Sequence, residues 1–207
     1  MSDPRAHRLA RIRLAAADLR AGGDRPRAPL PAPDAAPGDP GRFAERIAAA
    51  GAAVTRVGDP AALPGAVAAV LARHRAGRVV VPRDLDPGLR PPGVRLVPDD
   101  PPLDDDALAA ADAVLTACAL AIARTGTIVL DHTAGQGRRA LTLLPDLHVC
   151  VVRADQVVAD VPDAIAALGD RRRPVTFVSG PSATSDIELN RVEGVHGPRR
   201  LEVVLAG

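Results

Sequence analysis

The chain has no lysine, tryptophan or tyrosine, so all 26 of its basic residues are arginines. Without a lysine amine, it cannot form the Schiff base of a PLP enzyme or a Walker A phosphate loop. Its only aromatic residues are two phenylalanines, which leaves no platform for stacking bases and argues against binding of single-stranded nucleic acid. The 25 acidic residues bring the net charge to +1, so bulk charge attracts the chain to neither DNA nor a membrane surface.

Cysteine is also scarce. Cys118 and Cys150 lie in apolar runs with no CxxC or Cys/His spacing, which indicates buried, reduced thiols and no metal site. No apolar leader follows the N-terminal arginines, and no run of about 18 apolar residues occurs. We therefore expect a cytoplasmic protein without membrane insertion. Its 207 residues suit one full-sized domain with a tail.

The pattern along the chain predicts three parts: a helix within residues 1–21, a Pro/Gly-rich linker over 22–41, and a domain over 42–207. Short apolar runs alternate with amphipathic segments in the domain, which is typical of an α/β fold with helices on both faces of a mostly parallel sheet. The expected strands are Val54–Val57, Arg78–Val81, Val94–Val97, Asp112–Thr116, Thr127–Leu130, His148–Val152, Val175–Val178 and Leu201–Leu205. The expected helices are Phe43–Ala50, Pro60 to Gly77 with Asp59 as N-cap, Asp104–Ala111, Arg138–Leu144, Ala159–Leu168 and a piece near Ser185–Arg191.

Uncharged polar side chains gather in one segment, SGPSATSDIELN. It holds three of the four serines of the chain and its only asparagine. We expect this segment to follow a parallel strand at its carboxyl end and to open a helix, so that Gly180 and free backbone amides face an anion. A capping box from Ser185 to Glu188 is the structural alternative.

Two other segments are candidate sites. The TGT turn is followed by GQG and two arginines at a helix start, a pattern that suits an oxyanion or phosphate pocket. A lone GxG is weak evidence for such a pocket, and a mobile loop with solvated arginines is the alternative that the pattern favours. His196, between two glycines, suits a general base or an anion donor, or a simple turn histidine. The ligand-binding candidates are Thr125, Gly126, Thr127, Arg138, Arg139, Ser179, Gly180 and Ser182, and the catalytic candidates are Asp186, Glu188 and His196.

The runs TGTIVL, LLPDLHVCVV, VSGPSATSDIE and GVHGPRRLEVVL, in this order, resemble the LUD-domain family, specifically its lactate-utilisation C-type proteins, from about Arg42 to the C-terminus. The resemblance implies a three-layer α/β/α fold similar to the sugar-phosphate isomerase and CoA-transferase superfamily. It also implies a part in oxidising L-lactate to pyruvate beside iron–sulfur partner proteins. The resemblance implies an acid before TGT and another five positions earlier, where this chain has Arg124 and Ala119. If those acids carry catalysis in the relatives, this chain has lost or relocated it.

The residues and the resemblance together predict a non-metal subunit of a lactate-utilisation system that binds a small anionic ligand. The negative charge of this ligand would lie against the backbone amides after Ser179, between Ser182 and the loop of Arg138 and Arg139. Two alternatives stay open. One is a stand-alone enzyme for acyl or phosphoryl groups, with Glu188 or Asp186 as nucleophile or base; the other is a catalytically degenerate structural partner. The sequence identifies no cofactor and leaves homodimerisation open.

Overall fold

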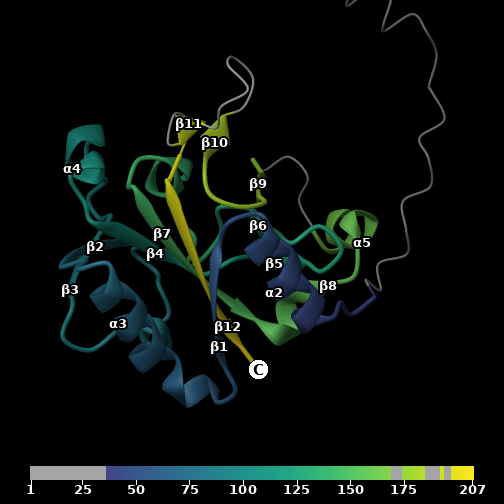
Figure 1. Ribbon diagram of the computed structural model, residues 1–207. Helices are drawn as coiled ribbons and strands as arrows, with labels where there is room; N and C mark the ends of the chain where they lie inside the picture. The colour runs from purple at the N-terminus through teal and green to yellow at the C-terminus, as the bar shows by residue number, and fades with distance from the viewer. Residues whose placement is uncertain (1–35, 169–173, 185–191, 194–196) are drawn as a thin grey trace, which may run out of the picture. The chain divides into compact units, whose positions relative to one another are not determined.

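A computed structural model describes residues 36–168, 174–184, 192–193 and 197–207 (Figure 1). Its centre is a six-stranded sheet with the order β1-β12-β7-β4-β2-β3, in which every neighbouring pair is parallel. The strands are β1 (Ala53–Val57), β2 (Arg78–Val81), β3 (Arg95–Pro98), β4 (Ala113–Thr116), β7 (Leu147–Arg153) and β12 (Arg200–Ala206). The two long strands, β7 and β12, pair along their full lengths at the middle of the sheet. Their apolar runs fit burial on both faces, so the parallel sheet expected from the sequence is confirmed.

Aspartates and prolines begin the main helices. The sequence predicts this start at Asp59, but α2 (Pro40–Ala49) begins within the expected linker and before the expected start at Phe43. Asp39 caps α2 by accepting from the Gly41 amide. Asp59 caps the 3₁₀ turn η1 (Pro60–Ala62), which leads into α3 (Leu63–Arg73). A carboxylate at the N-cap satisfies an amide that has no partner within the helix, and proline at N1 loses no hydrogen bond. The shorter helices are α4 (Asp105–Ala109) and α5 (Val161–Ala167).

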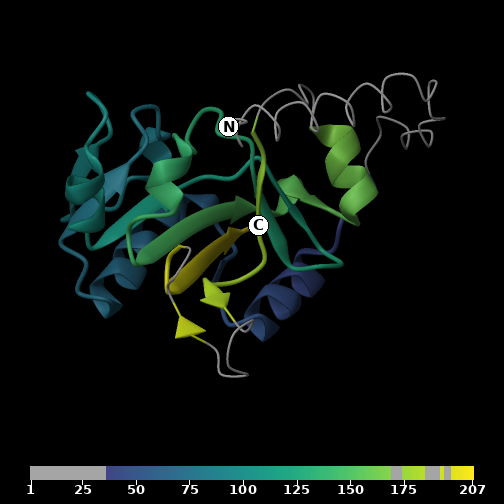
Figure 2. The ribbon, with the colours of Figure 1, turned by 90° about the horizontal axis from the view of Figure 1, so that it is seen from above.

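Alternate residues of the central strands face two different layers. On one face, Val149 and Val151 of β7 share a core with Val67 and Leu71 of α3. On the other face, Cys150 and Val152 pack with α2 and with a second, smaller sheet. Helix α5 covers the far side of that smaller sheet, and Figure 2 shows α2 and α5 together on the side away from α3. The result is the expected three-layer α/β/α arrangement, with an added sheet.

The added sheet was not predicted from the sequence. Its order is β8-β5-β6-β9, and β6 pairs antiparallel with both of its neighbours. Its strands are β5 (Leu120–Ile122), β6 (Thr127–Leu130), β8 (Val157–Val158) and β9 (Thr176–Val178). β5 and β8 have only three and two residues, too few to show an apolar period. The amides of Gly38 and Ala159 tie residues 36–38, at the end of the expected linker, to β8.

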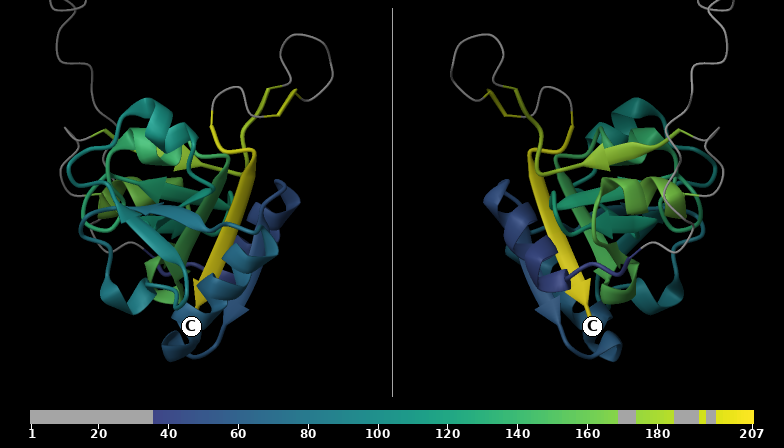
Figure 3. Two further views of the ribbon diagram at one scale, coloured as in Figure 1. Left: turned by 90° about the vertical axis from the view of Figure 1, so that its left-hand side faces the viewer. Right: turned by 90° about the vertical axis from the view of Figure 1, so that its right-hand side faces the viewer.

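One expectation for the serine-rich segment is wrong. It follows β9, an antiparallel edge strand of the smaller sheet, and it borders a pocket together with residues where β7 and β12 begin, at the amino edge of the large sheet. Within it, β10 (Ala183–Thr184) pairs antiparallel with β11 (Val192–Glu193). Figure 3 shows these two strands beyond the end of the sheet where β12 begins. The expected helix near Ser185–Arg191 lies outside the described residues.

Candidate functional site

The segment 179–182 borders a pocket of about 260 Å³, which we call the bend pocket. Its other walls come from β9, from the start of β7 and β12, and from the 3₁₀ turn η3 (Arg139–Thr142), which forms where the sequence predicts an α-helix. None of its described lining residues is acidic. The polar members of its lining are Arg139, Thr142, His148, Thr176, Ser179 and Ser182.

A chain of hydroxyl groups joins the TGT turn to this pocket. The Thr125 and Thr127 hydroxyl oxygens are 2.7 Å apart, and the Thr127 hydroxyl is again 2.7 Å from that of Ser179. Thr127 is buried, whereas Ser179 is exposed at the pocket. The structure therefore brings two of the predicted segments together, although 52 positions separate Thr127 from Ser179.

The glycines of these two segments serve packing. Gly126 has φ +63°, and a Cβ there would lie 2.4 Å from the Ile47 backbone nitrogen in α2. Gly180 has φ +129°, and a Cβ would lie 2.7 Å from the Ala50 carbonyl oxygen at the end of the same helix. Both positions combine a left-handed backbone with a close approach, which only glycine tolerates. The glycines thus fix the turn and the bend against α2.

The backbone of the bend offers less to an anion than the sequence suggested. Pro181 has no N–H, and the Ser182 amide donates to the Pro198 carbonyl at 2.8 Å. The segment therefore presents side chains to the pocket, and the expected series of free backbone N–H groups is not formed at Pro181 and Ser182.

The two predicted arginines have separate roles. Arg138 donates from Nε to Asp99 at 2.7 Å, from its terminal nitrogen to the other carboxylate oxygen at 3.1 Å, and to the Leu103 carbonyl. Burial acts to raise the Asp99 pKa, but the hydrogen bonds from Arg138 and from the Leu103 amide outweigh it and hold the pKa below its ordinary value. Arg138 therefore has a structural role: its guanidinium already binds Asp99 and the Leu103 carbonyl. Arg139 is exposed and lines the bend pocket, and no carboxylate within the described ranges pairs with it.

His148 lies at the inner wall of the bend pocket. It is 1% exposed, and its Nε2 is 2.8 Å from the Thr116 hydroxyl across the β4–β7 pair. The next two residues of β7 are Val149 and Cys150. A buried histidine with a hydroxyl partner closes the pocket toward the core of the sheet.

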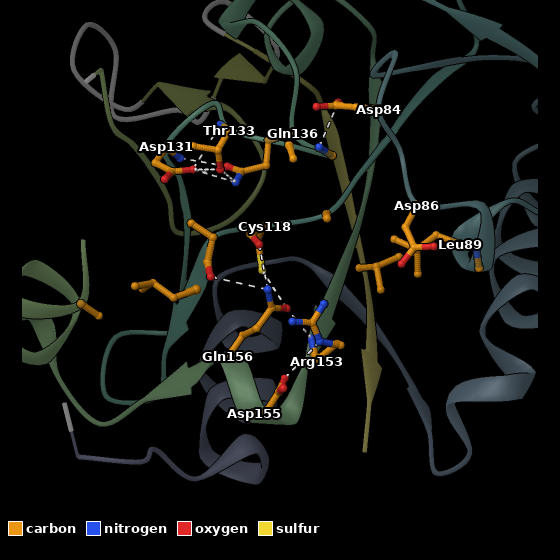
Figure 4. Close-up of a pocket in the computed structure, with 18 of the residues that line it drawn as sticks. Asp84, Asp86, Leu89, Cys118, Asp131, Thr133, Gln136, Arg153, Asp155 and Gln156 are labelled. Atoms are coloured by element: carbon orange, nitrogen blue, oxygen red, sulfur yellow. Dashed lines mark hydrogen bonds and ion pairs between the residues drawn. The ribbon is translucent and has the colours of Figure 1, made fainter. Parts of the chain in front are cut away.

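A larger cavity of about 850 Å³ lies at the opposite edge of the sheet (Figure 4). We call it the carboxyl-edge cavity, because the residues after β2, β4 and β7 line it together with the loop after β6. Asp131 in that loop accepts from the Thr133 hydroxyl at 2.6 Å and from the Gln136 amide at 2.7 Å. Burial acts to raise the Asp131 pKa, but these bonds outweigh it and keep the pKa below its ordinary value.

Sequence reasoning missed this second cavity. Its polar residues are spread over four separate loops as isolated aspartates, glutamines and a threonine, so no local motif marks them. The rule that ligands bind beyond the carboxyl ends of parallel strands could have found it, had the strand order been known. Figure 4 shows Cys118 between the Asp131–Gln136 loop and the group formed by Gln156, Arg153 and Asp155.

The remaining predicted residues lie elsewhere. Asp186, Glu188 and His196, the catalytic candidates, fall outside the described residues. Arg124, at the place of a family acid, donates to Asp160, and this bond is the main cause that lowers the Asp160 pKa. Over the described ranges, no three histidine, cysteine or acidic side chains gather as a metal site, and no helix has the length and apolarity to cross a membrane.

Comparison with known proteins settles the family. The LUD domain matches residues 103–206, and Lactate utilization protein C of Deinococcus radiodurans is 52% identical over 192 residues, 89% of each chain. The chain belongs to the LUD-domain family. Among other LUD relatives, Lactate utilization protein C of Bacillus pumilus is 40% identical over 91 residues, which is 41% of this chain and 38% of that one.

A solved LUD-family structure supports the same fold. The crystal structure of a DUF162 family protein from Deinococcus radiodurans matches with a TM-score of 0.66 and 44% identity. The match covers 81% of this chain and 95% of that chain. The family resemblance noted in the sequence is therefore confirmed, together with its three-layer architecture.

Proposed function

We propose that this protein acts in lactate utilisation as a subunit that binds a small carboxylate of the lactate and pyruvate class in the bend pocket. The role rests on family membership and on the name of its 52% identical relative, Lactate utilization protein C. The position rests on one observation: Arg139 has no carboxylate partner within the described ranges and borders the same 260 Å³ pocket as Ser179 and Ser182.

The chemistry of the pocket suits such a ligand. A guanidinium donates two parallel hydrogen bonds to a carboxylate, so Arg139 would hold the negative charge. The Ser179 hydroxyl, oriented by Thr127 at 2.7 Å, would bond the oxygen on the adjacent carbon. A volume of about 260 Å³ admits a metabolite of a few carbons and is small for a coenzyme.

The electrons of lactate oxidation would pass through partner proteins. An iron–sulfur cluster needs four ligands, usually cysteines, and the whole sequence has two. The proposed partners are therefore iron–sulfur proteins of the same pathway, on which this subunit would dock with its bound ligand. The names of the relatives support the pathway, lactate utilisation, and the iron–sulfur partners are what the resemblance in the sequence implies.

Calorimetry with L-lactate and with pyruvate tests the ligand. Arg139→Gln should weaken binding about 10- to 100-fold, because a charge-assisted hydrogen bond contributes about 1.5–3 kcal/mol. Arg95→Gln is the matched control, since Arg95 is an exposed arginine on edge strand β3 and lies outside the pocket lining. Equal affinity in the parent and in Arg139→Gln would refute this position. Turnover of a CoA ester by the protein alone would favour the stand-alone enzyme instead.

A further inference from the structure

The only two cysteines of the sequence meet in the fold. Cys150 lies in β7 directly opposite Thr116, the last residue of β4, and Cys118 follows two positions later as the chain leaves that strand. Both side chains belong to one core cluster, and each shifts the pKa of the other. Both are buried, with 4% of Cys118 and none of Cys150 exposed. Two thiols in contact provide both sulfurs that a disulfide needs.

The pair lies beside the carboxyl-edge cavity rather than in sealed core. Cys118 is one of the lining residues of that cavity, and Figure 4 shows it near the centre of the close-up. Gln156 holds it there: its amide nitrogen donates to the Cys118 carbonyl at 2.9 Å, and its oxygen accepts from the Cys118 thiol at 3.7 Å. A small molecule in the cavity therefore lies beside Cys118, and Cys150 belongs to the same core cluster as Cys118.

The surroundings of the two sulfurs favour one thiolate beside one thiol. The neighbouring Cys118 side chain, aided by His148 and Thr116 and opposed by burial, lowers the pKa of Cys150 to about 5. The same contact, together with burial, raises the pKa of Cys118. A thiolate is the nucleophile in sulfur chemistry, and a neighbouring thiol can resolve its oxidised form.

From the contact and the cavity, we propose that Cys118 and Cys150 form a two-electron redox site for a small peroxide. The Cys150 thiolate attacks one oxygen of hydrogen peroxide and breaks the O–O bond, which, with one proton, gives a sulfenic acid and water. The Cys118 sulfur then displaces hydroxide from that sulfenic sulfur, its own proton completing a second water. The sum is two thiols and one peroxide converted to a disulfide and two waters. This site is separate from the bend pocket and does not depend on the proposed ligand.

The test treats the reduced full-length protein with one equivalent of hydrogen peroxide, then denatures it, alkylates free thiols and measures the intact mass. The expected product has lost about 2 Da, takes up no alkyl group, and regains both thiols after treatment with dithiothreitol. Two alkylated cysteines after peroxide, or a gain of oxygen with no disulfide, would overturn the proposal. Cys118→Ser should instead stop at an oxidised Cys150 that carries added oxygen.

A pH series on the parent protein gives a readout that does not depend on a cysteine variant folding. The charged and titratable groups around the pair are His148, Arg153 and Asp155. With a thiolate already present, the rate of disulfide formation should stay within about twofold from pH 6 to 8, whereas an ordinary thiol near pKa 8.5 would react about tenfold faster per pH unit. A tenfold rise per unit would count against the proposed site.

Discussion

The amino edge of the parallel sheet differs sharply from its carboxyl edge. At the amino edge, the bend pocket holds Arg139, hydroxyl groups and no acidic residue in its described lining. At the carboxyl edge, the larger cavity is lined by Asp84, Asp86, Asp131 and Asp155 against the one arginine Arg153. Carboxylates repel an anion, so the edge where open α/β folds usually bind ligands is here the less suitable one for lactate. The location of a cavity follows from topology, but its ligand class follows from charge.

This contrast assigns different tasks to neighbouring residues, and the free energy of unfolding can test each assignment. The expected effects below run from the largest to the smallest.

Gly126→Ala tests whether the TGT turn belongs to the scaffold. A Cβ 2.4 Å from the Ile47 nitrogen at φ +63° should cost about 3 kcal/mol or more, as overpacking and left-handed strain add. Urea denaturation measures the loss. Gly65→Ala, in α3 with nothing within 4 Å of the added Cβ, is the control and should gain about 0.5–1 kcal/mol. Equal stability of both variants would mean that the turn can move away from α2.

Asp99→Ala tests the structural role of Arg138. Loss of the paired, buried carboxylate should cost about 2 kcal/mol at pH 7. The folded protein holds the Asp99 pKa below its ordinary value of 3.8, so this stabilisation is present above that value and is lost as the pH falls through the folded pKa. Urea titrations at pH 7 and below pH 3 should show the parent and the variant converging. A difference that persists in acid would point to packing instead of charge.

Asp131→Asn tests the hydrogen-bonded loop at the carboxyl edge. The amide keeps the shape but loses charged acceptors for Thr133 and Gln136, which should cost about 1 kcal/mol. Asp155→Asn changes an exposed carboxylate of the same cavity, 74% accessible, and should stay within about 0.5 kcal/mol. Thermal denaturation of both variants measures the difference. If Asp155→Asn loses as much as Asp131→Asn, the loop has no special role.

Arg139→Gln should leave stability within about 0.5 kcal/mol, since the side chain is exposed and forms no ion pair within the described ranges. Its effect is expected on carboxylate affinity alone. A large loss of stability in this variant would show that Arg139, like Arg138, belongs to the scaffold. Chemical denaturation beside calorimetry separates the two results.

The sequence predicted elements whose signal is local. Arg78–Val81 and Thr127–Leu130 form strands with the expected bounds, because continuous apolar runs between turn residues report burial directly. The cap at Asp59 was predicted from a single residue. The helix expected to run to Gly77 ends at Arg73, because Arg75 takes a left-handed backbone with φ 55° and the Ala76 amide donates back to the Leu71 carbonyl.

Only part of the candidate site could be predicted from the sequence. The TGT turn and the serine-rich segment stood out by composition, and the structure joins them through Thr127 and Ser179. Their position at the amino edge, the pairing of Arg138 with Asp99, and the contact of the two cysteines depend on which strands lie side by side. Such long-range pairing leaves no trace in spacing along the chain.

By itself, the sequence determined the chemical inventory: arginine as the only strong cation, two thiols, one cluster of hydroxyl groups, and enough alternating apolar runs to require a layered α/β domain. Only the tertiary structure decided how that inventory is divided. Strand order placed the hydroxyls and Arg139 at one edge of the sheet, and the aspartates and Cys118 at the other. Apolar periodicity is written in neighbouring residues, whereas the partner of a strand is chosen by packing across the whole chain.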